Sequence, residues 1–200
     1  MAQKDFTLDE LTVSATADSR GLDNRPASSL HYANLELTRK FLQDLPFDFT
    51  LTSVYRSPVV NSAVGGSSTS QHMNGLGIDL VPTGMTNKEL ATWLWANQAS
   101  YPELDQVIWY RDKGHAHIGI CPAKATNCVS GAPRADFYEA KNEGSTYTRW
   151  LPDNASLSQV VTMYAQSRPR VFMGAKILAL TLGAAGVVGL GVLLWRWKNK

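Results

Sequence analysis

The sequence lacks a strong excess of charge of either sign, with 19 basic and 17 acidic side chains among 200 residues. The charges are unevenly distributed. Six basic residues and no acidic residue lie from residue 156 onward, so residues 1–155 have 13 basic and 17 acidic side chains. Domains that bind nucleic acid need a basic surface excess, which residues 1–155 do not have. The composition therefore argues against a nucleic acid as partner.

An apolar leader is also lacking, because residues 1–5 are polar and no apolar stretch follows within thirty residues. A cleaved signal peptide is therefore not expected. Near the other end, residues 177–195 contain no charged side chain. At about 1.5 Å per residue, a helix of this length matches a hydrocarbon core of about 30 Å. We expect a transmembrane helix over residues 172–195, after a linker at 156–171 and before a basic tail at 196–200.

This apolar segment has further features of a membrane anchor. Trp195 and Trp197 lie where an interfacial aromatic belt forms. Ala185 and Gly189 form a small-xxx-small pair, which favours self-association of membrane helices. Basic residues flank both ends, so the charge asymmetry does not fix the orientation. We expect a single-pass membrane protein with a C-terminal anchor, for which the lipid bilayer is a partner.

Cysteine is scarce as well. Cys121 and Cys128 enclose six residues, and both a disulfide across this loop and two free thiols are consistent with the spacing. Cys121 follows His117 by four residues, so a role as metal ligand is a third and weaker alternative.

Local patterns predict helices and strands in alternation. Apolar residues recur at helical spacing and predict a helix that packs on the core: Leu30, Ala33, Leu37 and Phe41, with Leu35, Leu42 and Leu45 widening the stripe. Two capping boxes, at residues 7–10 and 86–89, each predict the start of a helix. Strands are expected at residues 47–55, 106–110 and 115–120, and the last two are joined by a hairpin-like turn at 111–114; residues 20–28 and 142–154 are expected to be loops.

Two histidine-containing elements suggest chemistry. His115 and His117 flank a single residue, so on a strand both imidazoles face one side while Ala116, Ile118 and Ile120 face the other. Such a strand would line a metal cleft above a core. A surface strand with two solvated histidines is the alternative that this pattern alone leaves open.

The second element contains His72 and Asp79, seven residues apart. The spacing suits a loop that carries the histidine and turns into a strand that carries the aspartate. Gly75 and Gly77 allow a positive φ or a close approach of the backbone to another element. Residues 78–81 are apolar around the carboxylate, and an aspartate in such a strand is rarely buried without a cation. Two imidazoles and a carboxylate form the ligand set of a catalytic zinc site with one open position.

Four separated motifs resemble, in the same order, those of zinc D-Ala-D-Ala carboxypeptidases and related phage peptidoglycan peptidases. Residues 70–79, SQHMNGLGID, are similar to the signature Ser-x-His-x-x-Gly-x-Ala-x-Asp, with Gly77 in place of the usual alanine. The other three are the opening FTLDEL at residues 6–11, the YRSP and VGG stretch at residues 53–67, and LDQVI at residues 104–108, which is similar to FDQLI. The resemblance spans roughly residues 5–122.

The resemblance implies an α+β zinc fold that is shared with lysostaphin-type enzymes and the hedgehog signalling domain. We expect an antiparallel sheet with packed helices around a zinc cleft, within residues 1–155. The resemblance further implies that His72, Asp79 and His117 bind Zn²⁺ and that peptidoglycan stem peptides are the substrate.

The same resemblance implies residues that contact the substrate. Arg56 would hold a substrate carboxylate or a polarised carbonyl, for which a guanidinium is suited. Ser70 and Gln106 are expected to contact the substrate beside it.

The general base is where the sequence departs from the family pattern. Many relatives place an acidic residue three positions before the last metal-binding histidine or at the end of the FDQLI strand, and here these positions are Gly114 and Tyr110. We expect His115 to take a proton from the zinc-activated water and to donate one to the leaving amine. Asp112 and Asp105 are the alternatives.

Taken together, these features predict a membrane-anchored zinc metallopeptidase that cleaves peptidoglycan as a carboxypeptidase or endopeptidase. A bacteriophage wall-degrading enzyme, active in entry or lysis, would reside in a virion internal membrane or in the host inner membrane. The alternative is a catalytically inactive wall-binding or structural virion protein that zinc stabilises, which the departures at Gly114 and Tyr110 allow.

Overall fold

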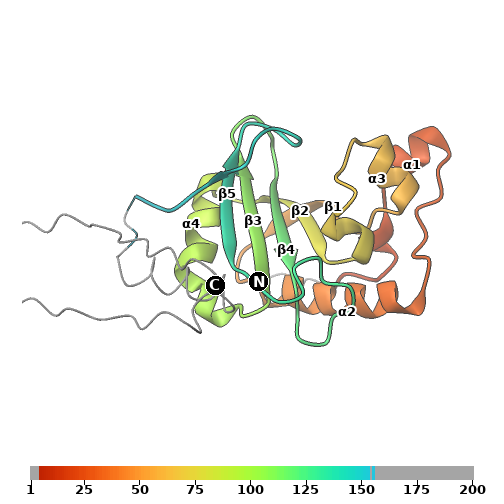
Figure 1. Ribbon diagram of the computed structural model, residues 1–200, viewed down its shortest axis with the longest axis horizontal. Helices are drawn as coiled ribbons and strands as arrows, with labels where there is room; N and C mark the ends of the chain where they lie inside the picture. Colours follow the sequence, from red (N-terminus) through yellow and green to blue (C-terminus); the bar gives the residue numbers. More distant parts are fainter. Residues whose placement is uncertain (1–4, 154, 156–200) are drawn as a thin grey trace, which may run out of the picture.

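The computed structural model describes residues 5–153 and 155 (Figure 1). The expected linker, transmembrane helix and basic tail lie outside these residues. The described part contains helices and strands in alternation, in this order: η1 (Glu10–Thr12), α1 (Ala15–Arg20), α2 (Ser29–Asp44), β1 (Phe49–Ser53), α3 (Pro58–Ala63), η2 (Gln71–Asn74), β2 (Gly77–Pro82), α4 (Asn87–Asn97), η3 (Gln98–Ser100), β3 (Leu104–Tyr110), β4 (Ala116–Ile120), β5 (Asp136–Ala140) and β6 (Thr148–Arg149). The α+β class is confirmed.

The strands form one six-stranded sheet in the order β1-β2-β4-β3-β5-β6. The expectation of an antiparallel sheet is wrong at one pair, because β5 runs parallel to β3 while the other pairs are antiparallel. The reason lies in residues 121–135. This connection carries the chain from the end of β4 past β3 before β5 begins on the far side, so β5 starts at the same end of the sheet as β3. Cys121 and Cys128 form a disulfide within this connection, which resolves the alternatives that their spacing left open.

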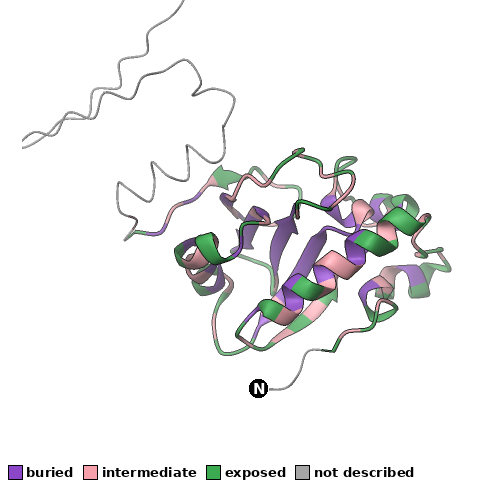
Figure 2. Cartoon of the chain, turned by 90° about the horizontal axis from the view of Figure 1, so that it is seen from below, coloured by how far each residue is buried: buried purple, intermediate pink, exposed green. Residues whose placement is uncertain are grey.

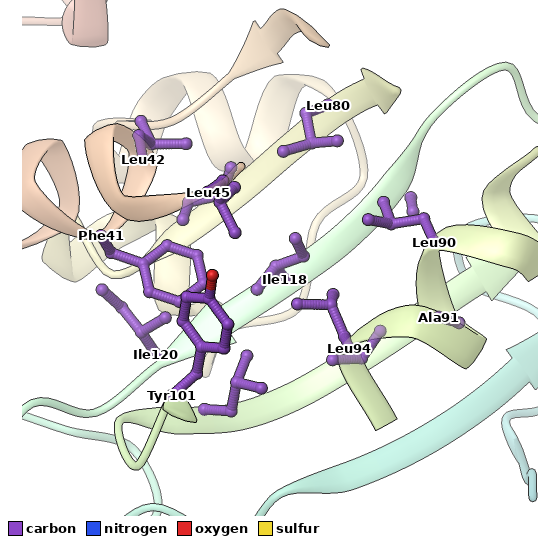
Figure 3. Packing of buried hydrophobic residues seen from close by; sticks show 14 of the residues in the cluster. Phe41, Leu42, Leu45, Leu80, Leu90, Ala91, Leu94, Tyr101, Ile118 and Ile120 are labelled. Carbon is purple, nitrogen blue, oxygen red and sulfur yellow. The ribbon is translucent and has the colours of Figure 1, made fainter. Parts of the chain in front are cut away.

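The two faces of the sheet differ. Helices α2 and α4 cover one face, where Leu80 and Ile118 of the strands pack in one cluster with Phe41 and Leu94 of the helices (Figure 3). Seen from below, α2 crosses the buried strands with its outer side exposed (Figure 2). Each large apolar side chain removed from water in this way contributes about 1.5–3 kcal/mol. Successive strand residues alternate between faces, so the residues next to Leu80 and Ile118 point to the opposite face, away from these helices.

The core-facing side of α2 agrees with the predicted stripe in part: Leu35, Phe41, Leu42 and Leu45 are buried. Leu30 is 47% exposed and Ala33 is also exposed, whereas Asn34 and Thr38 are buried. Asn34 Nδ2 donates to the carbonyls of Asn74 and Thr126, each at 2.8 Å, and Thr38 donates to the carbonyl of Gly75. Polar side chains occupy this inner face because they bind loop carbonyls that would otherwise be buried without partners.

The local signals for helix starts are confirmed. Thr86 and Glu89 form a reciprocal capping box at α4, and Thr7 and Glu10 exchange the same pair of hydrogen bonds before the single turn η1. α2 ends at Asp44 because Pro46 follows, and the residue before a proline is disfavoured from helical geometry. α1, α3, β5 and β6 have no counterpart in the sequence-based expectations, and β6 lies within the expected loop 142–154.

The predicted strands agree with the structure to within two residues at each end, and the predicted hairpin joins β3 to β4. Within residues 5–153 and 155, no helix has the length and hydrophobicity needed to cross a bilayer.

Candidate metal centre

Three predicted ligands meet on the sheet face opposite α2 and α4. Asp79 on β2 lies directly across from His117 on β4 in the antiparallel register, and His72 reaches them from the short helix η2. Asp79 Oδ1 lies 2.9 Å from His117 Nδ1 and 3.2 Å from His72 Nε2, and the two ring nitrogens are 3.2 Å apart. All three residues are buried. The prediction that Asp79 lies on a strand is confirmed, whereas His72 lies on the short helix η2 and not in a loop.

The tautomers of the two imidazoles leave an acceptor on each facing the centre. His72 Nδ1 lies 2.7 Å from the carbonyl of Val54, which can only accept, so this nitrogen carries the proton. His117 Nε2 lies 3.2 Å from Gln71 Oε1, which also accepts. In the neutral form of both rings the inner nitrogens are therefore unprotonated and converge on a carboxylate oxygen. Acceptor atoms this close repel one another unless a cation lies between them. Two imidazole nitrogens and a carboxylate oxygen are ligand types that suit Zn²⁺.

The pKa shifts of Asp79 and His117 favour the protonation states that metal ligands need. Burial alone would raise the pKa of Asp79, but the positive charge of His72 in its protonated form and the hydrogen bonds that protonated histidines donate hold the pKa well below its usual range, so the carboxylate is ionised and can face a cation. Burial lowers the pKa of His117, against the opposing effect of Asp79. An ionised carboxylate beside a neutral imidazole is the protonation state that metal ligands need.

Gln71 supports His117 from behind and was not predicted. Its Nε2 donates at 2.7 Å to Asp105, so its Oε1 must face His117. Asp105 is 0% exposed and also accepts hydrogen bonds from Ser130 and from two nitrogens of Arg134, at 2.7–2.9 Å. Such outer partners fix the tautomer and ring orientation of a metal-binding histidine.

The backbone of β3 and β4 leaves room for Gln71 and Asp105 behind His117. The register of β3 shifts between Leu104 and Gln106, so both Asp105 and Gln106 fall on the metal side. A Cβ at Gly119 of β4 would lie 1.8 Å from Gln71 Oε1, so only glycine leaves room for that amide. The predicted close approach at Gly77 is likewise confirmed, since a Cβ there would lie 2.7 Å from the backbone nitrogen of His72.

A cavity of about 400 Å³ opens over the three ligands. Arg56, Ser70 and Gln106, which the sequence predicts to contact substrate, all line it. Arg56 Nη2 donates to Asp79 Oδ2, and Arg56 Nε donates to Ser53 Oγ at 2.9 Å. With Oδ2 engaged in this way, Asp79 presents Oδ1 to the centre.

The structure separates the candidates for the general base. Asp112 lies in the hairpin turn, half-exposed, with Lys141 Nζ at 3.9 Å, and it does not line the cavity. Asp105 is enclosed by its donors beneath the site. Tyr110 lines the cavity, but burial raises the pKa of its phenol, so it stays protonated. His115 lies just before β4, and its Nε2 is 2.9 Å from Glu143 Oε1.

Glu143 is a second residue that sequence reasoning missed. It belongs to the loop between β5 and β6, far along the chain from the metal motifs, yet it lines the cavity. Ligand-type atoms of Asp79, His115 and Glu143 all lie within 4.8 Å of one another. A glutamate in a polar loop has no sequence signal that would single it out.

A family model described as Peptidase M15 matches residues 4–119, which include all three candidate ligands and end before Glu143. No curated protein and no solved structure matches the chain.

Proposed function

The chain belongs to the peptidase M15 family, and from this premise we propose that it is a zinc-dependent enzyme that cleaves peptide bonds of bacterial peptidoglycan. The observation that carries the proposal is the convergence of three metal-ligand side chains, His72, Asp79 and His117, at the base of a cavity. Bound zinc supplies an activated water and a Lewis acid for the scissile carbonyl.

The cavity is suited to a peptide with anionic groups. Arg56 and Arg134 both line it, and Ser70 and Gln106 add polar groups along its wall. Arg56 is closest to the ligands through its contact with Asp79, so a carbonyl oxygen that gains negative charge there would meet a guanidinium. Arg134 is anchored on Asp105 and presents a fixed positive charge farther along the cavity.

Membrane attachment is part of the proposal. The support is in the sequence: residues 177–195 have no charged side chain and are flanked by Lys176 and Arg196. A membrane-tethered wall peptidase fits a bacteriophage protein that opens the wall during entry or lysis, held in a virion membrane or the host inner membrane. Carboxypeptidase and endopeptidase activity both fit this site.

The test is digestion of purified peptidoglycan sacculi by the full chain in detergent, followed by mass analysis of the released muropeptides. We expect new amino and carboxyl termini within stem peptides, loss of activity with a chelator, and recovery with Zn²⁺. The mass of the products identifies the bond. A zinc-loaded protein that sediments with sacculi but releases nothing would contradict the peptidase proposal and support a wall-binding module.

A further inference from the structure

A carboxylate from a distant loop stands over the candidate metal centre. Glu143 lines the cavity, and its side chain is 35% exposed, so it is open to water and to substrate. Its ligand-type oxygen lies within 4.8 Å of that of Asp79, whose Oδ1 touches both metal-binding histidines. At this offset a water beside the three ligands would be within one hydrogen bond of Glu143.

The parallel pairing of β5 with β3 places this loop. Tyr110 at the end of β3 is paired with Ala140 at the end of β5, and the backbone of Asp112 donates to the carbonyl of Lys141. The loop that follows β5 therefore lies beside the β3–β4 hairpin, as seen at the top of the sheet (Figure 1). Glu143 thus reaches the end of β3 at which Tyr110 lies, the position where the relatives that the sequence resembles often have an acidic residue.

The neighbours of Glu143 assign the roles within the cluster. His115 Nε2 faces a carboxylate that only accepts, so this nitrogen carries its proton and is a donor toward Glu143. The ring of His115 packs edge-on against Tyr110, with centroids 5.5 Å apart, which holds the imidazole in place. The hydrogen bond from His115 lowers the pKa of Glu143, although burial acts in the opposite sense, so the carboxylate is ionised at neutral pH.

We propose that Glu143 is the catalytic carboxylate of this enzyme and that His115 is a positioning residue that orients it. The inference rests on the proposed peptidase function and replaces His115 as the expected base. Glu143 accepts a proton from the attacking water as the water oxygen bonds to the scissile carbonyl carbon. It then delivers that proton to the leaving nitrogen as the carbon–nitrogen bond breaks, which yields one amine, one carboxylic acid that retains the second proton of the water, and an ionised Glu143 again.

Four variants of the full chain test this assignment: Glu143→Gln, His115→Ala, His115→Gln and, as a matched control, Glu139→Gln. Glu139 lies near the end of β5, four residues before Glu143 and outside the cavity. Its Oε1 is 3.2 Å from Arg111 Nε. Each variant is compared with the parent for hydrolysis of sacculi, zinc content per chain and co-sedimentation with sacculi. Zinc content and co-sedimentation report whether the fold and the site survive.

We expect Glu143→Gln to reduce turnover by about 10²–10⁴-fold, the usual contribution of general acid–base catalysis. Zinc content and co-sedimentation should remain at parent values. His115→Ala should lose less activity, and His115→Gln should recover part of that loss because its amide can still donate to Glu143. Glu139→Gln should match the parent.

Each contrary result has a distinct meaning. An active parent with Glu143→Gln near full activity would overturn the assignment but leave the peptidase function standing. Greater loss in His115→Ala than in Glu143→Gln would return the role of base to His115. Two zinc ions per chain, reduced to one in Glu143→Gln, would make Glu143 a ligand instead. An inactive zinc-loaded parent would overturn the proposed function and this inference together.

Discussion

Asp79 and His117 lie opposite each other on adjacent antiparallel strands, with Asp79 Oδ1 2.9 Å from His117 Nδ1. The pairing of β2 with β4 therefore sets this distance through backbone hydrogen bonds, and η2 adds His72 from the loop that leads into β2. Two of the three candidate ligands are thus held by paired strands inside the sheet. A site of this kind is organised before its metal arrives.

Removal of any one ligand should abolish stoichiometric zinc binding. We expect the parent to hold one zinc per chain with ligand distances of about 2.0–2.2 Å, and His72→Ala, Asp79→Ala and His117→Ala to lose it. Elemental analysis and X-ray absorption spectroscopy measure both quantities. His31→Ala, which changes a histidine on α2 outside the cluster, is the control. Retention of zinc by all three ligand variants would refute the site.

The amide of Gln71 should tune zinc affinity through His117. Gln71→Leu removes the acceptor for His117 Nε2 and should weaken zinc binding by about 10–100-fold. Gly119→Ala should do the same, because its Cβ would occupy the place of Gln71 Oε1. The double variant should be no weaker than either single variant, since both act on one contact. Competition titrations with a zinc indicator measure this, and additive losses would argue for separate effects.

Arg134 should stabilise the fold through Asp105. Arg134→Ala leaves a fully buried carboxylate with only the neutral donors of Gln71 and Ser130, and should lower the free energy of unfolding by about 1–3 kcal/mol. Arg25→Ala is the matched control, because its pair with Asp23 is largely exposed and screened by water, so its loss should have a much smaller effect. Chemical denaturation of the metal-free proteins measures both. Equal effects would mean that Asp105 finds other donors.

Glu143 should make stability depend on pH in the acidic range. His115 lowers the pKa of Glu143 from 4.5, with Asp79 and Arg56 acting in opposite directions, so the folded chain binds this proton less tightly than the unfolded chain. The resulting stabilisation is complete above pH 4.5 and disappears as the pH falls through the lower folded pKa. The difference in unfolding free energy between parent and Glu143→Gln should therefore shrink below pH 4.5. A constant difference across the range would contradict this.

Removal of residues 172–200 should release the protein from detergent. The candidate site and its sheet lie within residues 5–149, and the apolar segment is separate in sequence, so the shortened chain should keep its fold and zinc content. Flotation with lipid vesicles compares the two proteins. Partition of the full chain into detergent-free buffer would contradict the membrane assignment.

The sequence predicted local structure correctly where the pattern involves residues close together in the chain. The capping box at Thr86, the alternation in residues 115–120 and the glycines around His72 each predicted a local geometry that the structure has. The stripe on α2 is correct for Leu35, Phe41 and Leu42, which are buried, but it omits two polar residues of the inner face. Asn34 and Thr38 are buried against the loop after η2 and the connection that follows β4. Apolar periodicity cannot detect polar side chains that face inward to satisfy distant carbonyls.

The sequence by itself determined the ligand types and their order, because His72, Asp79 and His117 lie in motifs with strong spacing. Only the tertiary structure decided what surrounds them. Gln71 and Glu143 became candidates for function because a bulge in β3 and the parallel entry of β5 bring Asp105 and the 141–147 loop to one face of the sheet. Contacts between residues 28 or more positions apart, such as His115 with Glu143, depend on strand order and direction, which no local pattern in the chain encodes.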